Sequence, residues 1–144
     1  GESEPEADKQ TPEQQTELQG LLAHLRVRFQ ERIKEVRLSS RLTDSASVLV
    51  AEEGDLGAHL EQLLQRAGRK VEVKKPILEL NPQSPIVEKL AHLLAVRPGS
   101  EEINTYSDLL LELAYLAQGS VPEPGALLSS LNRVLSRDLS SLAG

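Results

Sequence analysis

The sequence contains no cysteine, no methionine and no tryptophan, and these absences exclude several kinds of protein. Without cysteine there is no disulfide framework, no thiolate metal site and no cysteine nucleophile, and the chain suits a reducing cytosol. A natural translation start would carry methionine. We therefore expect Gly1 to be a processed end or, as we favour, the cut end of a piece of a longer protein.

Aromatic residues are scarce, because Phe29, Tyr106 and Tyr115 are the only ones among 144 residues. The core must therefore consist of aliphatic side chains, each contributing roughly 1.5–3 kcal/mol when it is fully removed from water. The length suits one domain with a working core. The sequence shows no signal peptide and no apolar run long enough to cross a bilayer, so we expect a soluble protein.

Positive charge is also in short supply. The chain has 16 basic residues against 22 acidic ones, which gives a formal net charge of -6. This balance disfavours nucleic acid or an anionic membrane as the main partner.

Patterns that indicate catalysis or cofactor binding are missing as well. His24, His59 and His92 fall on three different predicted helices without the spacing of a metal motif, and there is no nucleophile elbow or phosphate-binding glycine loop. We therefore expect no catalytic residue, no metal site and no cofactor-binding site. A hydrolase that uses Asp44, Glu79 and a histidine stays open as an alternative.

The N-terminal part of the chain predicts a linker and then a helix. Residues 1–10 are acidic and carry no large apolar side chain, which is typical of a disordered linker. Thr11 is a suitable N-cap, and Pro12 suits the first helical position. Apolar residues from Leu18 to Ile33 then recur at steps of three and four, which predicts a helix with one buried face.

The middle of the chain predicts strands alternating with helices. Apolar runs predict three short strands, over residues 34–39, 47–51 and 76–80. Asp55 is placed to cap a helix that closes at Gly68, and Ser84 with Pro85 begins another helix. The predicted fold class is α+β, a small three-stranded sheet packed with helices and followed by a C-terminal helix pair.

The C-terminal pair consists of leucine-rich helices predicted over residues 101–118 and 124–142. Its apolar positions cover more of the helix surface than one buried face requires, and exposed leucines of this kind need another chain to cover them. We predict a homodimer in which two such pairs form an intersubunit four-helix bundle. The residues predicted to form the dimer interface are Leu109, Leu110, Leu113, Leu116, Leu127, Leu128, Leu131 and Leu135.

A second leucine stripe, formed by Leu56, Leu60, Leu63 and Leu64, admits two interpretations. It can pack on the sheet, which the pattern alone favours. It can also stay exposed and bind partner proteins.

Two motifs resemble segments of the bacterial heat-shock protein 90 chaperones, the HtpG family. Residues 33–50, IKEVRLSSRLTDSASVLV, resemble the V-K-D-V-R and R-L-T-D segment of these chaperones, and residues 77–82, ILELNP, resemble their I-(F/L)-E-(L/I)-N-P strand and turn. The order and spacing of the two motifs agree, and the resemblance extends over about residues 18–136.

This resemblance implies that residues 11–144 form the C-terminal dimerisation domain of a stress-response chaperone, separated from its ATP-binding and middle domains. It implies that Leu56, Leu60, Leu63 and Leu64 contact unfolded or partly folded client proteins, which raises the exposed interpretation above the packed one. ATP and Mg would bind only to the parent protein.

The family resemblance also bears on location and partners. We expect a bacterial cytoplasmic protein, and the final residues Ser-Leu-Ala-Gly lack the acidic tail that tail-binding cochaperones use. A free-standing dimeric adaptor or assembly domain unrelated to an ATPase stays open as an alternative.

Overall fold

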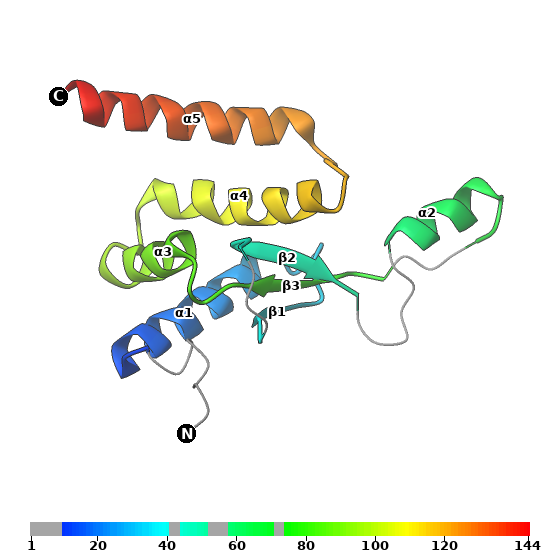
Figure 1. Ribbon diagram of the computed structural model, residues 1–144, viewed down its shortest axis with the longest axis horizontal. Helices are drawn as coiled ribbons and strands as arrows, with labels where there is room; N and C mark the ends of the chain where they lie inside the picture. Colours follow the sequence, from blue (N-terminus) through cyan, green and yellow to red (C-terminus); the bar gives the residue numbers. More distant parts are fainter. Residues whose placement is uncertain (1–9, 41–43, 52–57, 71–73) are drawn as a thin grey trace.

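The computed structural model describes residues 10–40, 44–51, 58–70 and 74–144. The elements run in the order α1 (Pro12–Arg28), β1 (Glu35–Leu38), β2 (Ser47–Val50), α2 (Ala58–Arg66), β3 (Ile77–Leu80), α3 (Pro85–Val96), α4 (Glu101–Ala117) and α5 (Pro124–Ala143). The α+β class and the three-stranded sheet predicted from the sequence are confirmed (Figure 1). The predicted linker, apart from Gln10, lies outside the described residues.

The sheet is organised around β3, which lies between a parallel β1 and an antiparallel β2. All four residues of β3 are buried, including Glu79. The Glu79 carboxylate lies 2.8 Å from the guanidinium of Arg37, its register partner on β1. A buried carboxylate is costly without such a partner, so this ion pair makes the acidic residue compatible with the central strand.

Helix α1 starts as predicted and ends earlier than predicted. Thr11 and Gln14 form a complete capping box at its start, and its buried face is made of leucines. Phe29 and Ile33, which the periodicity placed on the helix, are buried in the turn that follows Arg28. The amide groups of Arg32 and Ile33 both donate to the Phe29 carbonyl, so the chain reverses there while keeping the apolar spacing.

One core, aliphatic apart from Phe29, joins α1, the sheet, α3 and α4. Helix α4 lies over β2, and the buried Ser47 hydroxyl of β2 donates to the Leu110 carbonyl of α4 at 2.6 Å. Figure 1 shows α5 as the outermost layer, running along α4 on the side away from the sheet. The last two helices therefore form a hairpin in which only α4 reaches the core.

A left-handed glycine sets the turn of this hairpin. Gly119 has φ +83°, a conformation that side chains disfavour. Its amide donates to the Leu116 carbonyl at 2.9 Å, and the Ser120 amide donates to the Tyr115 carbonyl at 3.1 Å, which together form a Schellman motif. The helix pair is also held by Arg137 of α5, whose Nε lies 3.3 Å from the Glu102 carboxylate of α4.

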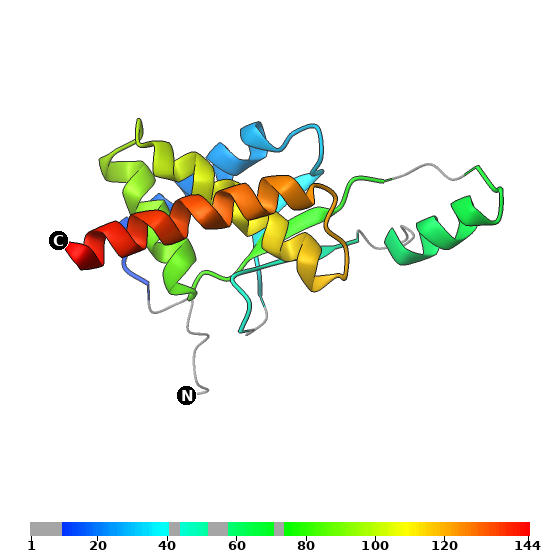
Figure 2. The same ribbon diagram turned by 90° about the horizontal axis from the view of Figure 1, so that it is seen from above.

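Helix α2 stands apart from the rest of the chain in both views (Figures 1 and 2). It ends at Arg66, and Gly68, with φ +81°, follows as the predicted C′ residue. The predicted start at Asp55 lies outside the described residues. Because α2 lies away from β1, β2 and β3, the interpretation that it packs on the sheet is wrong. Within the described residues, none of the helices combines the length and apolar composition that a bilayer crossing needs.

Candidate functional site

Helix α5 carries two apolar stripes, and only one of them is covered. Leu127 is buried, and Leu131 and Val134 are half-buried, on the helix that packs against α4. A second stripe consists of residues that are each more than half exposed, namely Leu128, Leu135, Leu139 and Leu142. Successive helical residues turn by about 100°, so this second stripe lies roughly a quarter of a turn around the helix from the first.

Helix α4 adds Leu113 and Leu116, which are also exposed. We refer to the exposed leucines of the two helices as the terminal leucine surface: Leu113, Leu116, Leu128, Leu135, Leu139 and Leu142. Large apolar side chains gathered on neighbouring helices mark an interaction site. The terminal leucine surface is therefore the first candidate site.

The residues predicted to form the dimer interface fall into two groups. Four of them belong to the terminal leucine surface, namely Leu113, Leu116, Leu128 and Leu135. Leu109 and Leu127 are buried within the chain, and Leu131 is half-buried between the two groups.

The prediction that Leu110 forms part of the dimer interface is corrected, because Leu110 is 1% exposed and belongs to the core over β2. Its side chain packs within its own chain and is unavailable to a second one. Leu139 and Leu142 were not predicted to form the interface, although both continue the same helical spacing.

The second candidate site is the apolar stripe of α2. Leu60 and Leu63 are 44% and 46% exposed, and Leu64 is half-buried. Leu56 lies outside the described residues. In contrast, Glu61 is only 5% exposed, and its carboxylate accepts a hydrogen bond from the Lys74 amide at 3.4 Å. Helix α2 thus turns its acid inward and Leu60 and Leu63 outward, which is the reverse of a helix that packs on a core.

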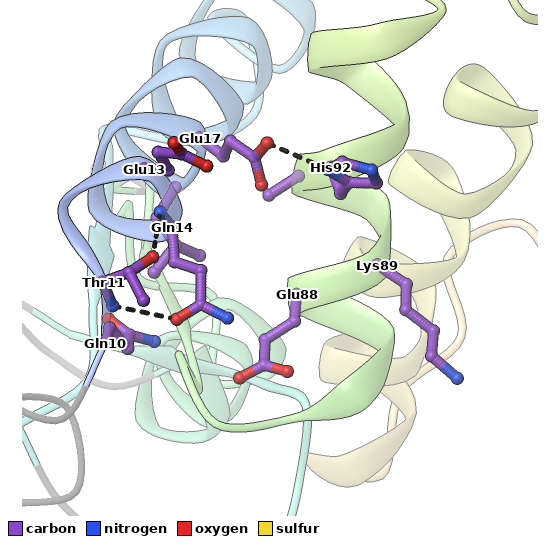
Figure 3. Close-up of a pocket in the computed structure, with 10 residues that line it drawn as sticks. Gln10, Thr11, Glu13, Gln14, Glu17, Glu88, Lys89 and His92 are labelled. Atoms are coloured by element: carbon purple, nitrogen blue, oxygen red, sulfur yellow. Dashed lines mark hydrogen bonds and ion pairs between the residues drawn. The ribbon is translucent and has the colours of Figure 1, made fainter.

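A polar groove of about 410 Å³ lies between α1 and α3 (Figure 3). Figure 3 shows Glu17 of α1 and His92 of α3 pointing toward one another, with Oε2 and Nδ1 2.9 Å apart. The Thr11 hydroxyl accepts from the Gln14 amide as part of the helix cap. These polar groups hold the helices, and the described part of the chain contains no group of three side chains that could bind a metal ion.

The residues of the hydrolase alternative do not form a catalytic arrangement with one another in the described part of the chain. Glu79 is ion-paired with Arg37, and Asp44 is exposed. His24 lies on α1, and its Nε2 is buried without a hydrogen-bond partner among the described residues. Burial lowers the pKa of His24, and the nearby charge of Arg28 lowers it further, so the neutral imidazole is favoured. None of these contacts joins a nucleophile to a base.

Comparison with known proteins shows to which family the chain belongs. A family model described as "Hsp90 protein" matches residues 2–143. The chain belongs to the heat-shock protein 90 family. The resemblance seen in the two sequence motifs is therefore confirmed at the level of the family.

Individual members of the heat-shock protein 90 family give the same result. The chaperone protein HtpG of Legionella pneumophila (strain Lens) is 34% identical over 131 residues, which cover 90% of this chain and 20% of that protein. HtpG of Shewanella loihica is 34% identical over 137 residues, covering 94% of this chain and 21% of that protein. HtpG of Geobacter metallireducens is 44% identical over 100 residues, covering 69% and 15%.

The relatives are bacterial, in agreement with the bacterial origin expected from the sequence. This chain spans about a fifth of the length of the curated relatives that it matches.

Proposed function

We propose that this chain is the C-terminal dimerisation and client-contact domain of an ATP-dependent chaperone of the heat-shock protein 90 type. The observation that carries the proposal is the terminal leucine surface, six exposed leucines on the outermost helix pair. In a four-helix bundle with a second copy, each leucine would lose its remaining exposure to water and contribute part of the roughly 1.5–3 kcal/mol that full burial of such a side chain gives. Membership of the family favours this function over a free-standing adaptor.

The proposed role of the dimer follows from effective concentration. Two chains joined at α4 and α5 would keep the ATP-binding domains of the parent protein near one another, so that their contact becomes intramolecular. Turnover of ATP and binding of Mg would belong to those domains. This chain would act as the hinge of a clamp and would itself catalyse nothing.

The proposed client contact is the stripe of α2. Leu60 and Leu63 are presented to solvent on a helix that stands away from the core, so a partly folded protein can cover them without disturbing the sheet. The terminal leucine surface and this stripe lie on different helices. Dimerisation and client contact can therefore be tested separately.

Sedimentation velocity at micromolar concentration tests the dimer. The unchanged chain should sediment as a dimer, and Leu135→Asp should sediment as a folded monomer, because Leu135 is exposed and a buried carboxylate opposes association. Val27→Asp is the matched control, since Val27 is an apolar residue on α1 that is even more exposed than Leu135. It should leave the dimer intact.

Two results would contradict the dimer. One is a monomer at micromolar concentration for the unchanged chain. The other is a Leu135→Asp variant with unchanged mass and an unchanged circular dichroism spectrum.

A further inference from the structure

Three basic residues stand at the outer end of α2, next to the exposed leucines. Arg66 lies in the last turn of the helix, and Arg69 and Lys70 follow Gly68. All three are exposed. We refer to one group of residues as the α2 docking surface: Leu60, Leu63, Leu64, Arg66, Arg69 and Lys70.

Within the described residues 58–70, the orientation of α2 turns its acid away from this positive charge. Glu61 is the only acidic residue in α2, and it is turned inward against the Lys74 amide. Arg66 follows Glu61 by five positions, which places them about 140° apart around the helix. Arg66 follows Leu63 by three residues, so the two are neighbours on the outward side. The outward side therefore carries leucine and arginine.

The cations are not needed to complete the helix. The Arg69 amide donates to the Leu64 carbonyl and the Gly68 amide to the Gln65 carbonyl, each at 3.0 Å, which is a Schellman motif. Backbone groups thus satisfy carbonyls that basic side chains otherwise cap. The guanidinium groups of Arg66 and Arg69 and the ammonium group of Lys70 can therefore bind a partner.

The charge of this surface contrasts with the rest of the protein. The chain as a whole carries a formal net charge of -6, yet its most isolated helix ends in three exposed cations. We propose that the α2 docking surface selects peptide segments in which an apolar run is flanked by Asp or Glu. The apolar run covers Leu60 and Leu63, while the flanking carboxylates meet Arg66, Arg69 and Lys70. Charge complementarity of this kind gives specificity and a faster association rate.

This inference rests on the proposed client contact and narrows it to one chemical class. An anionic lipid surface would also attract cations, but the net negative charge of the whole chain opposes it. An acidic peptide is small enough to approach the end of α2 alone. The peptide is therefore the favoured partner.

The experiment compares three labelled, unfolded peptides with one shared apolar core and with acidic, neutral or basic flanks. Binding to the full chain is followed by fluorescence anisotropy at low and high salt. The acidic peptide should bind about tenfold more tightly than the basic one at low salt, and the ratio should shrink at high salt because salt screens exposed charges.

Variants separate charge selection from apolar contact. Arg69→Glu with Lys70→Glu should abolish or reverse the preference, and Leu63→Ser should weaken all three peptides alike. The matched control reverses two exposed cations of α3 and its end, Lys89→Glu with Arg97→Glu, and has the same net charge. It should keep the preference. The circular dichroism spectrum verifies that each variant is folded.

Each other outcome decides a different question. Equal binding of acidic and basic peptides that still depends on Leu63 overturns charge selection and leaves client contact standing. Loss of all peptide binding in the unchanged chain overturns both, while dimerisation is judged independently by sedimentation. Capture by vesicles of phosphatidylglycerol without any preference among the peptides would assign the cations to a lipid surface instead.

Discussion

Arg28 of α1 and Asp108 of α4 form two parallel hydrogen bonds, Nε to Oδ1 at 2.8 Å and Nη2 to Oδ2 at 2.9 Å. The pair joins segments 80 residues apart and fixes the end of α1 against the middle of α4. The hydrogen bond that Arg28 donates to Asp108 raises the pKa of Arg28, which is in keeping with a geometry that favours the charged guanidinium.

Breaking this pair should destabilise the fold modestly. Both side chains are about one-third exposed, so Asp108→Asn is expected to lower the free energy of unfolding by about 1 kcal/mol. The loss should be smaller at high salt, because screening already weakens the pair. Urea denaturation measures it, and Asp138→Asn on the exposed side of α5 should have little effect. Equal midpoints for Asp108→Asn and the unchanged chain would show that the pair contributes nothing.

His24 should make stability depend on pH near neutrality. Burial and then Arg28 lower its pKa below the ordinary value of 6.5, so the unfolded chain binds a proton at a pH where the folded chain does not. The contribution of His24 is therefore fully present above pH 6.5 and is lost as the pH falls through the lowered folded value. His24→Gln should flatten the fall in urea midpoint that sets in as the pH drops below 6.5. An unchanged slope would exclude His24 as its source.

Leu110 and Leu135 should respond to substitution in opposite ways, although both were predicted to form the interface. Leu110→Ala removes a core side chain and should cost about 2–5 kcal/mol of folding free energy. Leu135→Ala should leave the stability of a single chain nearly unchanged and weaken association. Urea denaturation at a concentration where the chains are dissociated, beside sedimentation at higher concentration, separates the two effects.

The hairpin of α4 and α5 should depend on Gly119. Gly119→Val forces a β-branched residue into a left-handed conformation, at a cost on the order of 1–2 kcal/mol, although no neighbouring atom obstructs the side chain. Hydrogen exchange in α5 should become faster as a result. Gly125→Ala, placed inside α5, is the matched control and should slow exchange or leave it unchanged.

The sequence was most informative where the signal is local. Thr11 with Pro12 predicted the start of α1, and the Gly68 and Gly119 turns follow from residue chemistry that needs no distant partner. Apolar spacing located the strands and helices correctly within a few residues. It could not show where α1 ends, since Phe29 keeps the helical spacing after the chain has turned.

The sequence pattern does not show which neighbouring element covers each face of a helix. Leucine spacing does not distinguish Leu110, covered by the sheet, from Leu135, which stays exposed. The same limit applies to α2, because the inward position of Glu61 depends on the path of the chain near Lys74. The order β1-β3-β2 arises from pairing between distant segments, which no local pattern encodes.

The register of the sheet allows the segment that contains α2 to vary in length and sequence. Val50 at the end of β2 lies opposite Ile77 at the start of β3, so residues 51–76 leave and rejoin the ladder at a single rung. Lengthening or rewriting that detour leaves the rung between Val50 and Ile77 in place. Sequence changes in α2 can therefore alter its exposed surface while the register of the sheet is kept.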